Sequence, residues 1–419
     1  MNVFLFSKAP LCMLAGFCLA VSAGGTGGAV VAFEGRAAAQ PTSAAIAQGQ
    51  TRNISVTSQR ATNKQLSNKE VSKTLYVDGQ AGNDGAAGTF GAPLRTITQA
   101  IAAARPGMVI QLSPGTYNAE SGEQFPLKIP QGVVLRGSVS SRGKGVAIVG
   151  GGRFLSRTQA GQSVAIALGD GATAEGITVS NPNTRGTGIW VEGGKASILS
   201  STFSGSHREG VFLSGEANAT VRNNVFRQNG GNGIAITRQS RGVIANNVFD
   251  STGYGIAVGD RAAPLLQQNR VVNNRDGIVI SGSAQPTLRG NVIENNRNDG
   301  VVVIGQALPD LGTASSPGGN QIQGNGRNAV FNATRGKLQF PFYGNTISGP
   351  APAQVAIEAA PPRTSTVTPT EPVPRNTATT TIPVGETVPV EEFDGADGDG
   401  EASENPFFSP ILKGESSYQ

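Results

Sequence analysis

The sequence is poor in residues that crosslink a chain. Its 419 residues include only two cysteines, Cys12 and Cys18. Both fall in an apolar N-terminal stretch that resembles a signal peptide over residues 1–39, with the small residues Ala37 to Ala39 directly before Gln40. Once that stretch is removed, the chain has no disulfide and no thiolate chemistry. Burial must therefore stabilise the fold.

An uncleaved membrane anchor is the alternative interpretation of the same stretch. The run from Leu11 to Ala23 is shorter than the roughly 20 apolar residues of a transmembrane helix, but Leu11 to Phe33 together would reach that length. We predict cleavage, and hence no membrane span in the mature chain. The protein is then exported, to the periplasm, the cell surface or the extracellular medium.

Aromatic residues supply only 5% of the chain, and there is a single histidine. Leucine is also sparse, which argues against leucine-rich repeats. Glycine, by contrast, accounts for 58 residues, and asparagine is frequent between residues 181 and 345. Both residue types accept the backbone angles of tight turns, so the composition predicts many short strands rather than a helix bundle.

Charge is unevenly distributed along the chain. Residues 74–349 carry 23 Lys and Arg against 15 Asp and Glu, whereas residues 350–419 carry 3 against 11. A basic exported body favours anionic partners, such as an acidic polysaccharide or another component of the cell envelope, although a solvated polar surface can have the same composition. We expect no nucleic-acid partner.

A glycine followed by alternating apolar residues recurs at intervals of 22 or 23 residues. The glycines are Gly188, Gly210, Gly233, Gly255, Gly277 and Gly300. An asparagine recurs in step with them, at Asn224, Asn247, Asn269 and Asn291. After one insertion the series resumes at Asn320 and Asn345. Two series that keep one period over so many residues indicate a repeat architecture.

Each period contains three short apolar pieces, which is the content of one three-stranded coil of a β-helix. We therefore predict an all-β fold, a single-stranded right-handed parallel β-helix of about ten coils over residues 74–349. Equivalent residues would stack from coil to coil, so the asparagines would form an internal amide ladder, and Phe203, Phe226 and Phe249 an aromatic stack. Pro93 to Ala104 has helical spacing and is predicted to cap the N-terminal end.

Several segments lack the repeat. Residues 40–73 are polar and aperiodic, which predicts a disordered linker. Residues 350–419 are predicted to be a disordered tail, rich in Pro and Thr at first and acidic from Glu391 to Glu404. One apolar island, Asn405 to Leu412, is either fortuitous or a docking peptide. Within the β-helix, Ala307 to Gly319 is predicted to loop out between two coils.

Motifs near the start of the repeat region resemble a known family. They include Tyr76-Val77-Asp78, Gly82-Asn83-Asp84, Pro114-Gly115-Thr116-Tyr117 and Val133-Val134-Leu135-Arg136-Gly137. Together with the repeats that follow, they are similar to an uncharacterised N-terminal domain family of the pectin-lyase-like superfamily. The resemblance implies the β-helix fold but no established activity.

Many members of that superfamily cut acidic polysaccharides, which makes a polysaccharide lyase or a glycoside hydrolase an alternative function. The Asn-Thr-Asp, Asp-Asp and Gly-His-Gly elements of the pectin hydrolases and the Asp-Pro-His motif of the alginate epimerases do not occur in the sequence. The sole histidine, His207, is a weak candidate for general acid–base chemistry.

Stacking of coils also supplies paired carboxylates. Asp276 and Asp299 each precede a strand glycine on consecutive coils, and Glu209 takes the same place earlier, so the two aspartates are expected about 5 Å apart. Such a pair could share a proton, bind Ca²⁺ or act as acid and nucleophile. Alternatively, Arg275 and Arg297 neutralise them as structural ion pairs. Apart from this possible Ca²⁺, the sequence predicts no cofactor.

In each glycine repeat the middle apolar residue should point outward, beginning with Trp190 and Phe212. These two rings could carry a sugar, with Arg185 and Arg208 attracting its carboxylates. Alternatively, this outward-facing row of apolar residues could contact a partner or a second copy, or it could be covered by the protein's own loops and tail. The oligomeric state stays open.

These features predict an exported β-helix that binds a polysaccharide or a cell-envelope component. Whether it is also an enzyme is left open, with a lyase or glycoside hydrolase acting on acidic glycans as one alternative. A structural or adhesin-type surface protein is the other.

The exported protein should begin at or near Gln40, because signal peptidase cleaves after small residues such as Ala39. Intact-mass spectrometry of the exported chain measures this directly. Retention of residues 1–39 would identify the segment as an anchor.

Overall fold

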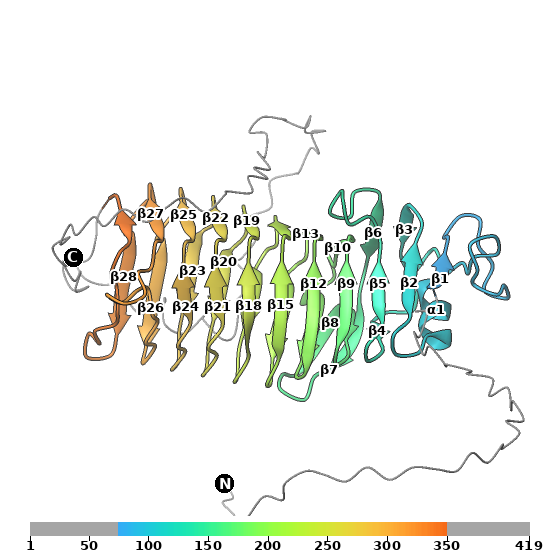
Figure 1. Ribbon diagram of the computed structural model, residues 1–419, viewed down its shortest axis with the longest axis horizontal. Helices are drawn as coiled ribbons and strands as arrows, with labels where there is room; N and C mark the ends of the chain where they lie inside the picture. Colours follow the sequence, from blue (N-terminus) through green and yellow to red (C-terminus); the bar gives the residue numbers. More distant parts are fainter. Residues whose placement is uncertain (1–73, 350–419) are drawn as a thin grey trace, which may run out of the picture. The chain divides into compact units, whose positions relative to one another are not determined.

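The computed structural model describes residues 74–349, which form a right-handed parallel β-helix of about ten coils (Figure 1). This confirms the predicted fold class. The predicted signal peptide, linker and tail, residues 1–39, 40–73 and 350–419, lie outside the described residues. No helix within residues 74–349 is long and apolar enough to cross a membrane.

The strands form three parallel sheets, and a regular coil contributes one strand to each. The first sheet contains β1 (Thr74–Val77), β2 (Val109–Leu112), β5 (Val134–Arg136), β9 (Ala172–Glu175), β12 (Lys195–Leu199), β15 (Asn218–Arg222), β18 (Arg241–Ala245), β21 (Leu265–Gln267) and β24 (Thr287–Arg289). The second contains β3 (Gly115–Tyr117), β6 (Val146–Val149), β10 (Thr178–Ser180), β13 (Thr202–Ser204), β16 (Val225–Arg227), β19 (Val248–Asp250), β22 (Arg270–Val272), β25 (Val292–Glu294), β27 (Gln321–Gln323) and β29 (Thr346–Ile347).

The third sheet carries the row of carboxylates and the outward-facing rings of Trp190 and Phe212. It contains β4 (Leu127–Ile129), β8 (Gly161–Leu168), β11 (Gly186–Glu192), β14 (Glu209–Ser214), β17 (Asn232–Ile236), β20 (Tyr254–Val258), β23 (Asp276–Ile280), β26 (Val301–Gly305) and β28 (Val330–Thr334). One further strand, β7 (Gly152–Leu155), pairs antiparallel with β8.

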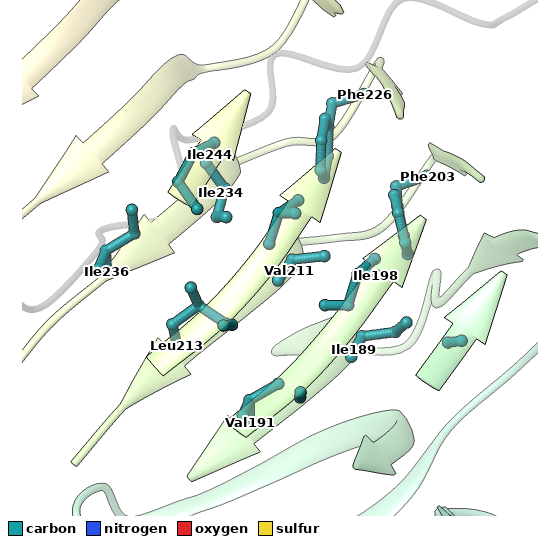
Figure 2. Close-up of a cluster of buried hydrophobic side chains, with 14 of the residues drawn as sticks. Ile189, Val191, Ile198, Phe203, Val211, Leu213, Phe226, Ile234, Ile236 and Ile244 are labelled. Atoms are coloured by element: carbon teal, nitrogen blue, oxygen red, sulfur yellow. The ribbon is translucent and has the colours of Figure 1, made fainter. Parts of the chain in front are cut away.

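The interior is filled by side chains that repeat from coil to coil (Figure 2). Phe203, Phe226 and Phe249 of the second sheet stack with ring centroids 5.0 and 4.6 Å apart. The repeated glycines of the third sheet leave room for these rings. A Cβ on Gly210 would lie 2.8 Å from Phe226, and one on Gly233 would lie 2.5 Å from Phe249. The glycine period therefore follows from packing between two sheets.

The predicted asparagines form a hydrogen-bonded ladder at the corner between the first and second sheets. The Nδ2 atom of Asn247 donates to Oδ1 of Asn269 at 3.1 Å and to the carbonyl oxygen of Val221 at 2.9 Å. Its Oδ1 atom accepts from the backbone N–H and the Nδ2 of Asn224. The same pattern continues through Asn291 and Asn320 to Asn345.

A second ladder, which the sequence analysis missed, follows five residues behind the first. It runs at the corner between the second and third sheets, where Asn274 donates to Asn296 at 3.1 Å and Asn296 to Asn325 at 2.9 Å. The signal was present in the sequence, because Asn269 and Asn274, for example, are five residues apart, and the interval recurs in later coils.

The N-terminal end is covered by α1 (Ile97–Ala103), which contacts β1, β2 and β4. The helix is shorter than the predicted segment from Pro93, because Thr96 is its N-cap. The buried carboxylate of Glu123 accepts hydrogen bonds from the backbone N–H groups of Ile97 and Thr98 at 2.7 and 2.9 Å, which satisfies helix donors that have no partner within the helix.

At the other end, the buried residues Phe340 and Phe342 belong to the core. The predicted loop, Ala307 to Gly319, contains no strand of the first sheet. It lies beside β24 of that sheet, through a bridge between Asp310 and Thr287 and an ion pair between Asp310 and Arg289 at 2.6 Å. The loop therefore takes the place of one strand of its coil.

Replacing Asn269 with alanine should lower the free energy of unfolding by about 1–3 kcal/mol, because buried donors and acceptors on both neighbouring coils lose their partners. Urea unfolding measures the change. The matched control is Asn218→Ala, at an exposed position, which should change stability by less than about 0.5 kcal/mol. Equal effects of the two substitutions would contradict a stabilising role of the ladder.

Candidate functional site

Strand register aligns the predicted carboxylates in one row along the third sheet. Glu209 pairs with Asn232, Asn232 with Tyr254, and Tyr254 with Asp276. The guanidinium of Arg275 lies over the Tyr254 ring, 4.4 Å from its centroid. The row thus collects ionisable groups on consecutive coils, and their hydrogen bonds decide what chemistry they can perform.

Asp276 and Asp299 are adjacent, and both carboxylates are bonded within the fold. Asp276 Oδ1 accepts from the backbone N–H of Asp299 at 3.2 Å, and its Oδ2 lies 3.6 Å from Arg275 Nε. Asp299 Oδ1 accepts from the backbone N–H and the Nδ2 of Asn328, at 3.0 and 2.7 Å. Among the described residues no ion pair joins Asp299 to Arg297, so the expected second ion pair is replaced by these amide bonds.

Burial raises the pKa of Asp276, and hydrogen bonds from Asp299 and Asn298 and the charge of Arg275 act in the opposite direction. Through these hydrogen bonds, each of the two aspartates is joined to the next coil, as the ladder asparagines are. Within residues 74–349 no group of three or more His, Cys, Asp or Glu side chains is arranged to hold a metal ion.

Glu209 is completely buried and lies in a polar cluster. Its Oε1 is 2.9 Å from Arg208 Nη2, and its Oε2 accepts from Thr187 Oγ1 at 2.8 Å. Arg208 Nη1 also donates to Gln162 Oε1 of β8, at 3.2 Å. Burial raises the pKa of Glu209, while Arg208 and Thr187 act against that shift. The pair joins two coils to the β7–β8 hairpin, and Arg208 is not available to an external carboxylate.

His207 has surroundings that do not support acid–base catalysis. Its backbone N–H donates to the carbonyl oxygen of Asn181 at 2.9 Å. Its Nδ1 atom is buried and has no hydrogen-bond partner among the described residues. No carboxylate of the described chain lies within ion-pair distance of the ring. An acid–base role needs such an orienting partner or direct access to substrate.

Trp190 and Phe212 point outward, as predicted, but they do not form an exposed platform. Each is only 2% exposed, and their rings lie parallel at a centroid distance of 4.2 Å. Each ring therefore covers a face of the other, and Phe154 packs against Trp190 at 5.7 Å. A sugar stacks on a free ring face. Neither ring thus offers a free face to a sugar, and their burial fits cover by the protein's own chain, one of the predicted alternatives.

The covering segment is residues 152–161, which we call the strap. Beyond Phe154 it bonds to the ends of successive third-sheet strands. Thr158 donates from its backbone N–H to Glu192 Oε1 at 2.7 Å, and its hydroxyl lies 2.7 Å from that of Ser214. The carbonyl oxygen of Thr158 accepts from Arg238 Nη2 at 2.8 Å. The strap thus crosses the coils of β11 and β14 and ends beside β17.

Glu192 holds the strap in place. Its Oε1 also accepts from Ser156 Oγ at 2.6 Å and from Thr158 Oγ1 at 2.8 Å. Burial by itself would raise the pKa of Glu192, but the hydrogen bonds from Ser156 and Thr158 outweigh it and lower the pKa below its usual value. The carboxylate is therefore charged at neutral pH, and its bonds to the strap are charge-assisted.

A pocket of about 450 Å³ lies where the strap ends, at the corner between the third and first sheets. Three consecutive coil corners line it, through Arg238, Gln239, Asp260, Arg261, Gly282 and Ser283. Backbone hydrogen bonds hold the corners together, from Arg261 to Arg238 at 2.9 Å and from Ser283 to Asp260 at 2.7 Å.

The corner pocket contains two arginines, Arg238 and Arg261, but only one acidic residue, Asp260. Asp260 Oδ2 accepts from the backbone N–H of Arg238 at 2.9 Å and lies 3.8 Å from its Nε. Arg261 is exposed and has no acidic partner within ion-pair distance in residues 74–349. The pocket therefore presents one uncompensated guanidinium beside amide, hydroxyl and carboxylate groups. Sequence reasoning missed it, although corner residues of neighbouring repeats can be aligned by the 22-residue period.

Arg185, the remaining predicted ligand residue, is exposed and precedes β11 at the corner between the second and third sheets. The corner pocket follows β17, at the opposite edge of the third sheet. The predicted set of Trp190, Phe212, Arg185 and Arg208 is thus not brought together as one open site.

A family model described as "Protein of unknown function (DUF1565)" matches residues 80–349, which is nearly all of the described β-helix. The chain belongs to this family. Among the curated proteins, none matches the chain in sequence. The DUF1565 domain thus contains both asparagine ladders, the strap and the corner pocket.

Solved structures similar to the DUF1565 domain include pectate lyase Pel9A, with 15% identity and a TM-score of 0.46 over 68% of this chain and 81% of that one. XylC, solved with xylose, shows 11% identity and a TM-score of 0.43 over 66% and 70%. The A-module of mannuronan C-5 epimerase AlgE4 from Azotobacter vinelandii has 15% identity and a TM-score of 0.36, and the match covers 68% of this chain and 98% of the A-module. Likeness at this level carries nothing about activity.

Glu192→Gln should loosen the strap, because an amide replaces the charged acceptor of three hydrogen bonds. Trp190 is the only tryptophan of the chain, so acrylamide quenching of its fluorescence reports strap opening. We expect quenching to rise in the variant and to stay unchanged in the control Glu216→Gln, at an exposed position.

The pH dependence has a defined sign. Since folding lowers the pKa of Glu192, its stabilisation of the strap is complete above the unfolded-state value of about 4.3 and is lost as the pH falls through the lower folded value. Quenching should therefore increase in acid for the parent protein and change less for Glu192→Gln. Identical acid profiles would contradict the role of Glu192.

Proposed function

We propose that the DUF1565 domain binds an acidic polysaccharide without cleaving it, and that the corner pocket is the binding site. The observation that carries this proposal is the unpaired guanidinium of Arg261 in a 450 Å³ pocket otherwise lined by polar groups. A uronic acid carboxylate can accept hydrogen bonds from Arg261, while Gln239, Ser283 and Asp260 can bond to ring hydroxyls.

The mixed lining supports a sugar over a simple anion. A phosphate or sulfate site would gain nothing from Asp260, which repels anions, whereas hydroxyl groups need an acceptor of this kind. The surplus of basic residues in the β-helix, 23 against 15 acidic ones, further favours a polyanion by long-range attraction.

Binding without cleavage is supported by the state of the candidate catalytic groups. Asp276 and Asp299 are bonded to the next coil, Glu209 is bonded to Arg208, and His207 has no acidic partner among the described residues. None of these groups lines the corner pocket. A structural or adhesin-type role is compatible with the same site if the polysaccharide belongs to a cell surface.

Export is part of the proposal. It is supported by the signal-peptide pattern of residues 1–39, which ends in small residues before Gln40. A polysaccharide of the cell envelope or its surroundings would then be accessible, in the periplasm, at the cell surface or outside the cell.

Arg261→Ala should weaken binding of polygalacturonate by about fivefold, the worth of one exposed charge-assisted contact. Isothermal titration calorimetry with polygalacturonate, and with neutral dextran as a comparison, measures the affinity. Arg222→Ala, an exposed arginine at the end of β15, is the matched control and should bind as the parent does.

Two results would count against the proposal. Equal binding by the Arg261 and Arg222 variants would place the ligand elsewhere on the basic surface. New reducing ends or unsaturated products after incubation with polygalacturonate would instead identify a hydrolase or a lyase, the alternative function predicted from the sequence.

A further inference from the structure

The outer face of the third sheet carries a row of small apolar side chains beyond Phe212. Strand register aligns them on four consecutive coils, and Phe331 of β28 closes the row. We call this row the apolar gutter, which consists of Ala235, Ala257, Val279 and Val302. The row is thus a continuous apolar face that begins beside Phe212 and ends at Phe331.

The gutter has the burial of a covered face. Val279 and Val302 are 4% and 7% exposed, whereas the outward-facing valines of the second sheet, Val248 and Val292, are only half-buried. The bonds of the strap extend no further than Arg238, directly after β17. The strap therefore accounts for the cover of Trp190 and Phe212, and among the described residues none of its hydrogen bonds reaches the coils of Ala257, Val279 and Val302.

One segment of the chain has the length and composition to occupy the gutter. The distance from Phe212 to Phe331 is five strand spacings, or about 24 Å. The island Asn405 to Leu412 has eight residues and can span up to about 26–29 Å when extended. Half of its residues are large and apolar, namely Phe407, Phe408, Ile411 and Leu412.

Charge and reach favour the same segment. Arg238 and Arg275, at opposite edges of the gutter, are paired with Asp260 and Asp276. The exposed Arg261, which follows β20 at one edge, has no acidic partner within ion-pair distance in residues 74–349. The stretch directly before the island, Glu391 to Glu404, contains seven acidic residues and no basic one. The last coil ends at Gly349, and the 55 residues in between are more than enough to return along five coils.

We propose that Asn405 to Leu412 docks as an extended peptide in the apolar gutter of its own β-helix, with the acidic stretch beside Arg261. Aromatic side chains are the strongest anchors of such contacts, which assigns the main role to Phe407 and Phe408. The docking requires no glycan, and it is tested without one.

Engineered cysteines can test the docking because residues 74–419 contain no natural cysteine. In the full chain with Cys12→Ser and Cys18→Ser, Val279→Cys is combined with Ser409→Cys, which keeps both phenylalanine anchors, and exposed to oxidised glutathione. The control combines Ser409→Cys with Val248→Cys, which faces outward from the second sheet. Docking raises the local concentration of the two thiols, so the gutter pair should form a disulfide at least about tenfold faster than the control pair.

The products distinguish the possible occupants. A disulfide-linked monomer, identified by its intact mass and peptide map, is the expected result. A linked dimer would assign the gutter to a second copy, and equal rates or no linkage in both pairs would show that the tail does not dock. Val302→Cys serves as a second gutter position, and circular dichroism verifies that each variant is folded.

Discussion

The amide hydrogen bond between stacked asparagines is the constraint on which the remaining structure depends. Each internal asparagine, such as Asn269, bonds to a backbone carbonyl of the preceding coil and to the asparagine of the next coil. A buried amide left without a hydrogen-bond partner would lower the free energy of unfolding by about 1–3 kcal/mol. Coils can therefore stack only in the register that pairs every amide. The core phenylalanines, the strand glycines and the outward rows follow from that register.

Register also explains where specific features can arise. Positions inside the coils must match their neighbours above and below, which limits them to small, apolar or self-pairing residues. The corner between the third and first sheets carries neither asparagine ladder and is less restricted. Three consecutive turns of that corner line the corner pocket, and the strap is an excursion from a single coil. Arg238 belongs to both features, since it bonds to Thr158 of the strap and lines the pocket. Arg261 also lines the pocket and lies at the same edge of the apolar gutter, so an acidic tail and an acidic glycan would meet the same charge.

Much of the fold could be predicted from the sequence because the repeat has a physical period. Asn224, Gly210 and Phe226 recur at the spacing of one coil, and spacing alone assigned strands and interior. The candidate site was less predictable. The period correctly predicted that Trp190 and Phe212 point outward, but it does not show whether another segment covers them. The covering strap precedes the regular repeats in the sequence, so the period gives no information about it. The use of Glu209 and the aspartates within the fold likewise depends on neighbours, such as Gln162 and Asn328, that are distant in sequence.

The ladders restrict how a gene for this architecture can change length. An insertion or deletion of a whole repeat returns every amide to an equivalent partner, whereas one of a few residues would offset both ladders from that coil onward. Shorter changes must be absorbed at a corner, and Ala307 to Gly319 does this: Asn320 still bonds to Asn291, although 29 residues separate them instead of 22. Related β-helices are therefore expected to differ in length by whole coils, and shorter insertions or deletions are expected only in loops.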